Sequence, residues 1–300
     1  MLHLLNGDAT AAVFPDELPG ERAVWRDILM EGPASGDAEA RAQWLAPRLG
    51  ITAETYARRF REGEATLARA REHDEVVLWF ERDLFCATNL WFVLARLDAP
   101  RVSLVFPEVN QDVRGLGTLA AEQFPMLFED RYPLSADEIA EARRVWQAYA
   151  GPDPTALARL EPAFPFALGA VRMHVGRFPS VAHGLDEVEY ETLAFLERPL
   201  DFAALFRRVT EVHDEMGLGD VQFAATLRDL TAGATPLVRI EAAAEPFGRW
   251  RVSRTDAAAD VLAGRADRLA LVPLERWLGG VHLRPGAPGW RWDGRTLVAA

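Results

Sequence analysis

The chain is predicted to be an α/β protein, with a Rossmann-like parallel sheet in an N-terminal domain and a helical, winged-helix-like C-terminal domain. Three observations favour this class. Short apolar runs alternate with helical segments over the first third of the chain, which is typical of a doubly wound parallel sheet. Residues 75–80 contain a continuous apolar run, as expected of a strand buried on both faces. After residue 184, three capped helical segments precede two β-like runs.

The elements of the N-terminal domain follow from the apolar runs and from the residues that interrupt them. A short helix is predicted to begin near Asp8, which suits an N-cap, and to end before Pro15. Right-handed crossovers would place the C-terminal ends of all the strands on one side of the sheet. The predicted strands cover residues 2–5, 23–25, 75–80 and 101–106, and the longer helices cover 38–49, 53–72 and 88–97.

Helices are predicted for the middle of the chain. A capping box at residues 135–138 begins a helix that ends before the Gly- and Pro-rich break at 151–154. The next helix, 155–175, is interrupted by Pro162 and Pro165.

The C-terminal domain begins with three helices whose expected caps are Asp186, Asp201 and Asp220. Two β-like runs follow, at 236–241 and 249–253. Three helices followed by a two-stranded wing is the winged-helix order, so this arrangement is predicted here.

The domain boundaries are predicted at 1–150 for the Rossmann-like domain, 151–183 for a helical linker and 184–300 for the winged-helix-like domain. Residues 276–293 are rich in Trp and Gly. We expect this segment to be irregular or hairpin-like and to fold back as a tie between the two modules, because Trp side chains commonly anchor interfaces.

The composition is that of an ordinary globular protein and excludes several classes of function. The 300 residues are 49% hydrophobic and carry a net charge of −12, which argues against a general nucleic-acid surface. The single cysteine makes no internal disulfide. All 33 basic residues are arginine, so neither a Schiff-base lysine nor a P-loop lysine is available. Lacking a long apolar run and a signal-peptide pattern, the chain is predicted to be cytoplasmic, without membrane contact.

Three predicted strands end in acidic turns. The first strand leads into Asp8, the second into Asp27 and Glu31, and the third into Glu81 and Asp83. Parallel sheets bind ligands outside the carboxyl ends of their strands. These five carboxylates are therefore predicted to gather at one edge and to carry the catalytic chemistry.

Such carboxylates support more than one chemistry. They could hold Mg²⁺ or Mn²⁺ together with water and a substrate phosphate, with Asp8 and Asp83 as the predicted metal ligands. A carboxylate pair could instead act as acid and base without a metal, since crowding raises one pKa, or bind sugar hydroxyls or a cationic substrate. In the structural alternative, Asp8 only caps a helix, and Arg26 and Arg82 neutralise neighbouring acids.

The first acidic turn has a second predicted use. A helix that starts at Asp8 points free backbone N–H groups outward, which suits a phosphate or carboxylate. Gly7 permits close approach of a ligand, although many βα turns contain Gly and Asp without binding one. The predicted substrate-binding residues are Asn6, Gly7, Thr10, Arg26 and Arg82.

Three motifs, at residues 5–10, 24–33 and 79–85, carry a family resemblance. On these motifs the chain resembles a bacterial family catalogued as domain of unknown function 1835, and the likeness covers nearly the whole chain. The resemblance implies a shared fold and no established reaction. Members of the family often carry His at the positions of Met30 and Arg82, and Asp at the position of Cys86. Because this chain lacks those histidines, the resemblance implies no histidine-based mechanism here. Further segments that fit are 115–117, 276–283 and 290–293.

Other motifs favour structural roles. Residues 115–120 fit the GxGxxG/A pattern, but about eight residues separate them from the strand ending at Phe106, so a loop leading into a helix is predicted instead of a dinucleotide site. Cys86 is interpreted as a buried structural residue. The expected recognition helix, 219–230, carries two Asp residues and does not resemble a phosphate-binding face. The local basic cluster near the wing is Arg249, Arg251 and Arg254.

The leading hypothesis is a bacterial enzyme, a metal-assisted hydrolase or transferase, acting on a small phosphate-bearing or nucleotide-like substrate in the acidic pocket. The second is a ligand-sensing regulator whose winged-helix module contacts nucleic acid or a protein. The third is a scaffold without a catalytic site. The sequence leaves the substrate, the metal and the oligomeric state open.

Overall fold

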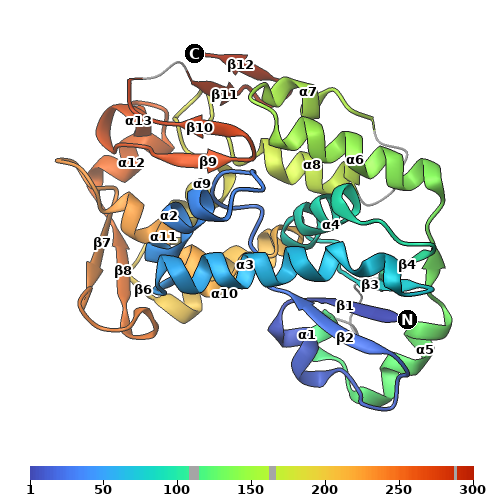
Figure 1. The fold of residues 1–300 in the computed structure, drawn as a ribbon. Coiled ribbons are helices and arrows are strands. Elements are labelled where there is room, and N and C mark those ends of the chain that lie inside the picture. Colours follow the sequence, from blue (N-terminus) through green and yellow to red (C-terminus); the bar gives the residue numbers. More distant parts are fainter. Residues whose placement is uncertain (108–114, 162–166, 287–288) are drawn as a thin grey trace.

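The computed structural model describes residues 1–107, 115–161, 167–286 and 289–300. It is a mixed α/β structure with a five-stranded, mostly parallel sheet and many helices (Figure 1). The sheet belongs to the N-terminal half, and the C-terminal half is mainly helical with three small sheets. Within the described part of the chain, no helix combines the length and the apolar character needed to cross a lipid bilayer.

The main sheet has the strand order β2-β1-β3-β4-β5. The first four strands are parallel, and β5 pairs antiparallel with β4 at the edge. In the register, Leu4 lies opposite Ala23 on one side and Leu78 on the other. The strands are β1 (Leu2–Asn6), β2 (Glu21–Trp25), β3 (Val76–Trp79), β4 (Val102–Val105) and β5 (Tyr132–Pro133).

Side chains alternate between two cores on the faces of this sheet, as the two-residue period of a strand requires. Leu4 and Leu78 belong to the large core, which α3, α4 and α6 cover. Leu5 and Trp79 belong to a smaller core beneath α1 and α5. The helices of this half are α1 (Asp8–Val13), α2 (Ala38–Leu49), α3 (Ala53–Ala68), α4 (Leu84–Arg96), α5 (Phe124–Glu129) and α6 (Ala136–Ala150).

The structure corrects one predicted helix start and one predicted cap in this half, whereas α1 begins at Asp8 as predicted. The fourth helix begins at Leu84 and not at Thr88, because the Asp83 carboxylate accepts a hydrogen bond of 2.7 Å from the Cys86 N–H and caps the helix. Asp8 is not the cap of α1, because Gly7 occupies the cap position with φ +91°. A short 3-10 helix (Leu116–Thr118) lies within the predicted loop after β4.

The C-terminal half contains several helices and a three-stranded sheet with the order β6-β8-β7. The predicted cap Asp220 is instead the first helical residue of α11, with Gly219 before it. The predicted interruption at Pro162 and Pro165 lies outside the described residues. The elements are α7 (Pro154–Ala158), α8 (Ala167–Val175), α9 (Glu187–Phe195), β6 (Leu200–Asp201), α10 (Phe202–Val212), α11 (Asp220–Leu230), β7 (Val238–Glu241), β8 (Arg251–Arg254), α12 (Asp256–Leu262) and α13 (Arg268–Leu271).

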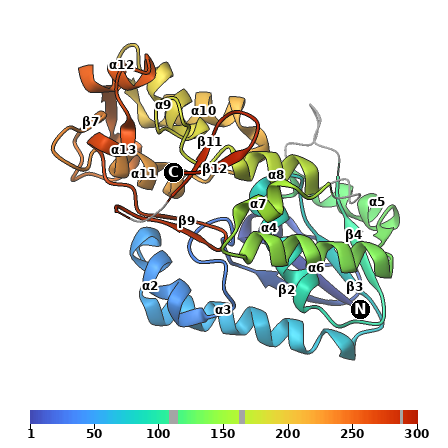
Figure 2. The same ribbon diagram turned by 90° about the horizontal axis from the view of Figure 1, so that it is seen from above.

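The Trp-rich tail forms two hairpins and contacts the N-terminal half. Gly279 accepts a hydrogen bond of 3.0 Å from the Ala34 N–H, and the Gly280 N–H donates to the Tyr149 carbonyl over 2.9 Å. In Figure 2, β9 lies between the C-terminal elements and α2. The paired strands are β9 (Arg276–Leu278) with β10 (Val281–Leu283), and β11 (Trp290–Trp292) with β12 (Leu297–Ala299).

Candidate functional site

The strand order of the main sheet reverses between β1 and β3. The chain passes from β1 outward to β2, then returns to the opposite side of β1 with β3. Ligands of open α/β sheets bind at such a point, outside the carboxyl ends of the strands. Space is open there: Gly7 ends β1, and a Cβ at this position would meet no atom within 4 Å.

Glu81 and Asp83 form a carboxylate pair just beyond the end of β3. A carboxylate oxygen from each and the Cys86 Sγ all lie within 4.8 Å of one another. Glu81 Oε1 accepts a hydrogen bond of 2.9 Å from the Leu116 N–H. Asp83 is held by the N-terminus of α4, where the Cys86 N–H donates to it. The two loops that follow β3 and β4 therefore hold these acids side by side.

Burial favours the protonated forms of these groups, and neighbouring carboxylates add to this at Glu81 and Cys86. Burial first, and the Asp83 charge second, raise the pKa of Glu81 from 4.5 to about 7, against the hydrogen bond from Leu116. Burial also raises the pKa of Asp83, and the hydrogen bonds from Cys86 oppose this. The pKa of the Cys86 thiol is raised by burial and then by both carboxylates. Of the three, Glu81 has the pKa suited to proton transfer near neutrality.

Two glycines shape the walls around the carboxylate pair. A Cβ at Gly115 would lie 2.8 Å from Glu81 Oε2. Gly217, from the C-terminal half, has φ +65°, and a Cβ there would lie 2.6 Å from Cγ of Asp83. This turn after Asp214–Met216 therefore closes on Asp83, and a side chain at residue 217 would collide with it.

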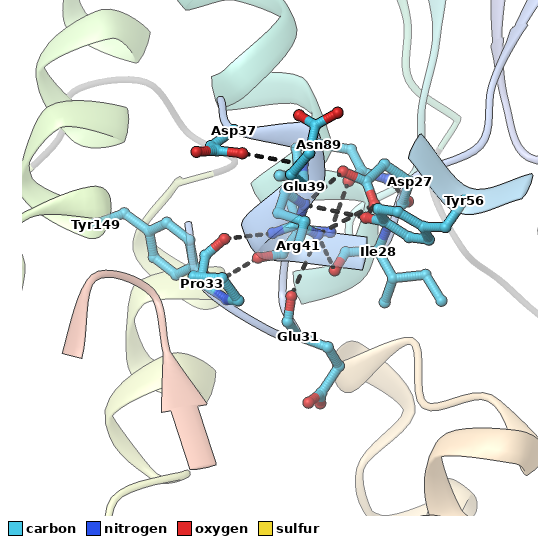
Figure 3. A network of polar contacts seen from close by, with 11 residues as sticks. Asp27, Ile28, Glu31, Pro33, Asp37, Glu39, Arg41, Tyr56, Asn89 and Tyr149 are labelled. Carbon is cyan, nitrogen blue, oxygen red and sulfur yellow. Dashed lines mark hydrogen bonds and ion pairs between the residues drawn. The ribbon is translucent and has the colours of Figure 1, made fainter. Parts of the chain in front are cut away.

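Asp27 has a different environment, a buried polar network (Figure 3). Its carboxylate accepts hydrogen bonds of 3.0 Å from Nε and Nη2 of Arg41, and a short one from the Tyr56 hydroxyl. The Arg41 side chain is 0% exposed and that of Asp27 is 4% exposed. Arg41 also donates to the carbonyls of Ile28, Glu31 and Pro33, so it holds the loop after β2 in place.

Asn6 belongs to a network that joins β1 to α4. Its Nδ2 donates to the Cys86 Sγ over 2.9 Å, and its Oδ1 accepts from Asn89 over 2.9 Å. Asn89 also donates to the Asp27 carbonyl over 2.8 Å. Asn6 is 7% exposed. These contacts join the end of β1 to α4, next to the Cys86 thiol.

The other predicted residues of this edge are dispersed. Asp8 forms an exposed ion pair with Arg26, with 2.6 Å between Oδ1 and Nε. Thr10 is 2% exposed, within the packed side of α1. Arg82 is exposed, and its guanidinium lies 5.1 Å from the centre of the Phe106 ring. Asp8 is not part of the metal-ligand grouping of Glu81, Asp83 and Cys86 found among the described residues.

Glu31 lies at a cavity between α2, α11 and β9. Its carboxylate is paired with Arg177, which also donates to the Met30 carbonyl. In Figure 3 the Glu31 side chain points away from Arg41. The interior of this cavity, about 60 Å³, has room for a few water-sized groups. The predicted single cluster of five carboxylates is thus divided among four environments, and the structure brings Glu81 and Asp83 together.

Sequence reasoning missed Arg41 as the partner of Asp27. A signal was present, because the buried positions of α2 are 38, 41, 42, 45 and 46, which follow the spacing of one helix face. An arginine in such a stripe must find a buried anion.

Comparison with models of known protein families found no match, and neither did comparison with curated proteins.

Proposed function

We propose that the chain is an enzyme acting on a small phosphate-bearing or nucleotide-like substrate at the strand ends of β1 and β3. One observation carries the proposal: Glu81 and Asp83 form a carboxylate pair at the point of strand reversal, and the pKa of Glu81 is about 7. A carboxyl group with this pKa occurs in both protonation states near neutral pH, which suits general acid–base catalysis. Glu81 would be the catalytic residue, and Asp83 would tune its pKa.

Two features favour an anionic substrate. Arg26 and Arg82 follow β2 and β3 and are both exposed at this edge, where Arg26 lies beside Asp8 and Arg82 beside the Phe106 ring. Open space at Gly7 lets a substrate approach the backbone at the end of β1. Arginine binds phosphate oxygens with a planar pair of donors.

Mg²⁺ or Mn²⁺ fits the same carboxylate pair. Both ions prefer oxygen ligands and are commonly held by one or two carboxylates plus substrate phosphates. Glu81 and Asp83 would hold the ion, in place of the Asp8 and Asp83 set predicted from sequence. When bound, the ion would polarise a phosphoryl oxygen and hold Glu81 in its anionic form, so that Glu81 would then serve as a ligand instead of an acid–base residue. The Cys86 thiol, whose pKa is raised, would stay protonated.

A thermal-shift screen with Mn²⁺, nucleotides and sugar phosphates tests this proposal. We expect a stabilising ligand for the wild type and for Glu54→Gln, an exposed acid at the start of α3. Glu81→Gln and Asp83→Asn should lose most of the shift, whereas Asp8→Asn should keep it. Equal shifts in all five proteins would contradict the proposed site, and a loss in Asp8→Asn and Asp83→Asn but not in Glu81→Gln would restore the ligand set predicted from sequence.

A Rossmann-like class for the N-terminal half and a winged-helix-like class for the C-terminal half are part of this proposal. The order α9, α10, α11, β7, β8 supports the second, as does the pairing of β6 with β8. Family membership in domain of unknown function 1835 also remains a proposal, supported by the motifs at residues 5–10, 24–33 and 79–85.

The winged-helix order favours a second candidate function, a regulator that contacts nucleic acid or a protein. The wing arginines are already engaged: Arg249 pairs with Glu245, Arg251 with Asp201, and Arg254 donates to a backbone carbonyl. DNA mobility shift at moderate salt separates the candidates. Salt-sensitive binding that is lost in the Arg249→Ala, Arg251→Ala double variant would favour the regulator, and its absence would favour the enzyme.

A further inference from the structure

Two buried asparagines connect the loop after β2 to the carboxylate pair at the strand ends. Asn6 is the last residue of β1, and Asn89 lies about one helical turn after Cys86 on α4. Asn89 is 0% exposed and Asn6 is 7% exposed, so their amide groups must find partners inside the protein. The hydrogen bonds of these amides form a chain with one direction, and this direction determines where the Cys86 thiol points.

The orientation of the Asn89 amide is fixed by the backbone of the loop after β2. Its Oδ1 accepts a hydrogen bond of 3.2 Å from the Leu29 N–H, a group that can only donate. Its Nδ2 donates over 2.8 Å to the Asp27 carbonyl, a group that can only accept. Exchanging the two amide atoms would bring two donors together at Leu29 and two acceptors together at Asp27. The observed orientation is therefore the one that the backbone allows.

Asn89 in turn fixes the orientation of the Asn6 amide. Asn89 Nδ2 also donates to Asn6 Oδ1 over 2.9 Å, so Oδ1 is the acceptor of the Asn6 amide. The Asn6 Nδ2 group then faces the Cys86 Sγ, 2.9 Å away. Because an amide N–H cannot accept, the sulfur accepts in this contact, and its own S–H bond must point away from Asn6.

Carboxylate oxygens are the acceptors that lie near this thiol. One oxygen of Glu81, one of Asp83 and the Cys86 Sγ are within 4.8 Å of one another. The Cys86 side chain hydrogen-bonds to Asp83, whose carboxylate also accepts from the Cys86 N–H over 2.7 Å. Cys86 is 4% exposed, so its S–H finds its acceptor within the protein. A carboxylate is a stronger acceptor than a neutral group, which favours Asp83 as that acceptor.

We infer that Asn6 and Asn89 are positioning residues for the carboxylate pair, because they turn the Cys86 thiol so that its S–H donates to Asp83. Cys86 then holds the Asp83 carboxylate with two donors, its N–H and its S–H, next to Glu81. The loop after β2 thereby sets the geometry of the pair through the two asparagines. This positioning role rests on the function proposed for the strand ends, whereas the orientation of the thiol does not.

Infrared spectroscopy of the wild-type protein tests the orientation of the thiol, because the chain has one cysteine and therefore one S–H stretching band. Donation to a carboxylate weakens the S–H bond more than donation to water does. The band should therefore lie at a lower frequency in the folded protein than in the unfolded chain. Cys86→Ser should remove the band, which identifies it. A folded-state band at or above the frequency of the unfolded chain would overturn the inference.

Asn89→Asp tests whether the asparagines set this orientation. An aspartate at residue 89 still accepts from Leu29 but cannot donate to Asn6, so the Asn6 amide should turn over and present Oδ1 to the sulfur. The S–H would then donate to an amide oxygen, a weaker acceptor than a carboxylate, and the band should move to higher frequency. Gln43→Glu makes the same change at an exposed position of α2 and should leave the band in place. An unmoved band in folded Asn89→Asp would overturn the positioning role.

A second measurement does not depend on a variant that folds. In NMR spectra of the wild type, the side-chain amide protons of Asn6 and Asn89 should exchange slowly with solvent, since both groups are buried and donate hydrogen bonds. Exchange as fast as that of the exposed Gln43 amide would overturn the inference.

None of these measurements requires a substrate, so they separate the inference from the proposed function. A lowered S–H band in a protein that no ligand stabilises in the thermal-shift screen would remove the proposed function and confirm the orientation of the thiol. A band at the unfolded frequency in a protein that a ligand does stabilise would overturn the inference and leave the proposed function in place.

Discussion

Asp27 and Glu81 are both largely buried, yet their surroundings act in opposite directions. Asp27 faces the Arg41 guanidinium, so its charge is compensated where water is absent. Glu81 faces another carboxylate, and its charged form is opposed by burial and by repulsion. The first arrangement stabilises a loop, and the second holds a proton that can be given up near neutral pH.

Replacing Glu81 with Gln should remove a pH dependence of stability. A carboxyl group whose pKa rises from 4.5 unfolded to about 7 folded binds its proton more tightly in the folded state. Wild-type stability should therefore fall as pH rises from about 4.5 to 7, by up to ~3 kcal/mol from this group. Urea unfolding of both proteins between pH 4.5 and 8 measures the difference.

The variant should unfold with a flatter pH profile and become the more stable protein above pH 7. Glu54→Gln, at an exposed position, should keep the wild-type profile. Parallel profiles for the wild type and Glu81→Gln would show that Glu81 ionises in the folded chain as it does in water.

Replacing Arg41 with Met should destabilise the protein strongly. The change leaves the Asp27 carboxylate buried without its cation, which typically costs about 3–5 kcal/mol. Urea unfolding measures this loss, and the Asp27→Asn, Arg41→Met double variant should recover part of it because no buried charge remains. A loss below about 1 kcal/mol would mean that water reaches Asp27.

For single residues, the positions of the carboxylates could be predicted from the sequence better than the cations that pair with them. It placed Glu81 and Asp83 together because both follow one buried strand. It did not separate Asp27 from them, because the residue that neutralises Asp27 lies fourteen positions away, on α2. Spacing along the chain cannot show which cation reaches which carboxylate.

At the scale of single elements, the turn that contains Gly217 has the sharpest geometric requirement. Gly217→Ala would place a methyl group 2.6 Å from Cγ of Asp83, at a residue with φ +65°. Gly50→Ala is the matched control, since Gly50 has φ +67° and open space around it. The free energy of unfolding of Gly50→Ala should fall by about 1 kcal/mol, from backbone strain alone.

Gly217→Ala should lose clearly more than this, roughly 2–3 kcal/mol, because the collision adds to the strain. It should also reduce any ligand-induced thermal shift at the strand ends, since Asp83 or the turn must move. Thermal unfolding of the two variants side by side supplies the comparison. Equal losses would show that the turn yields without disturbing Asp83.

Element positions were predicted well where a local signal was complete. The capping boxes at Ser135 and Asp186 begin α6 and α9 as expected, and the apolar run at 75–80 contains β3. The start of α4 was misplaced because Asp83 was interpreted only as a site residue, whereas it also caps the helix. The two-residue strand β5 carries too little pattern to be predicted, since it is defined by pairing with β4.

For the whole molecule, contacts between the two halves predict a single unfolding transition. Arg177 of the C-terminal half is 6% exposed and pairs with Glu31 while donating to the Met30 carbonyl. The Gly280 N–H of the tail donates to the Tyr149 carbonyl over 2.9 Å. Differential scanning calorimetry should therefore give one transition, with equal calorimetric and van't Hoff enthalpies. Two separate transitions would mean that the halves fold independently.

Arg177→Met should lower the melting temperature by several degrees, because Glu31 and a buried carbonyl lose their partner. Arg58→Met is the control: its pair with Glu62 is exposed on both sides, so the change should be within about 0.5 kcal/mol. If both variants melted alike, the contact between the halves would contribute no more than a surface ion pair.

The sequence also predicted that the Trp-rich tail ties the modules together, and the contacts of Gly279 and Gly280 agree with this. The boundaries at 1–150, 151–183 and 184–300 stay predictions. The contact of Arg177 with Glu31 and Met30 across the two halves could not be predicted, because the side chain of Arg177 gives no periodic signal. Long-range contacts of this kind are set by packing, not by local pattern.

The turn at Gly217 links the strand ends to the stability of the other half. Met216, beside it, is 1% exposed and packs in the large core. A ligand that displaced this turn from Asp83 would also disturb the packing of Met216, and this cost would reduce its binding free energy. Thermodynamic linkage makes this effect mutual. A partner that held the C-terminal half rigid would lower the affinity for such a ligand by the same factor as the ligand would lower the affinity for the partner. The ligand affinity at the strand ends would then depend on how rigidly the C-terminal half is held.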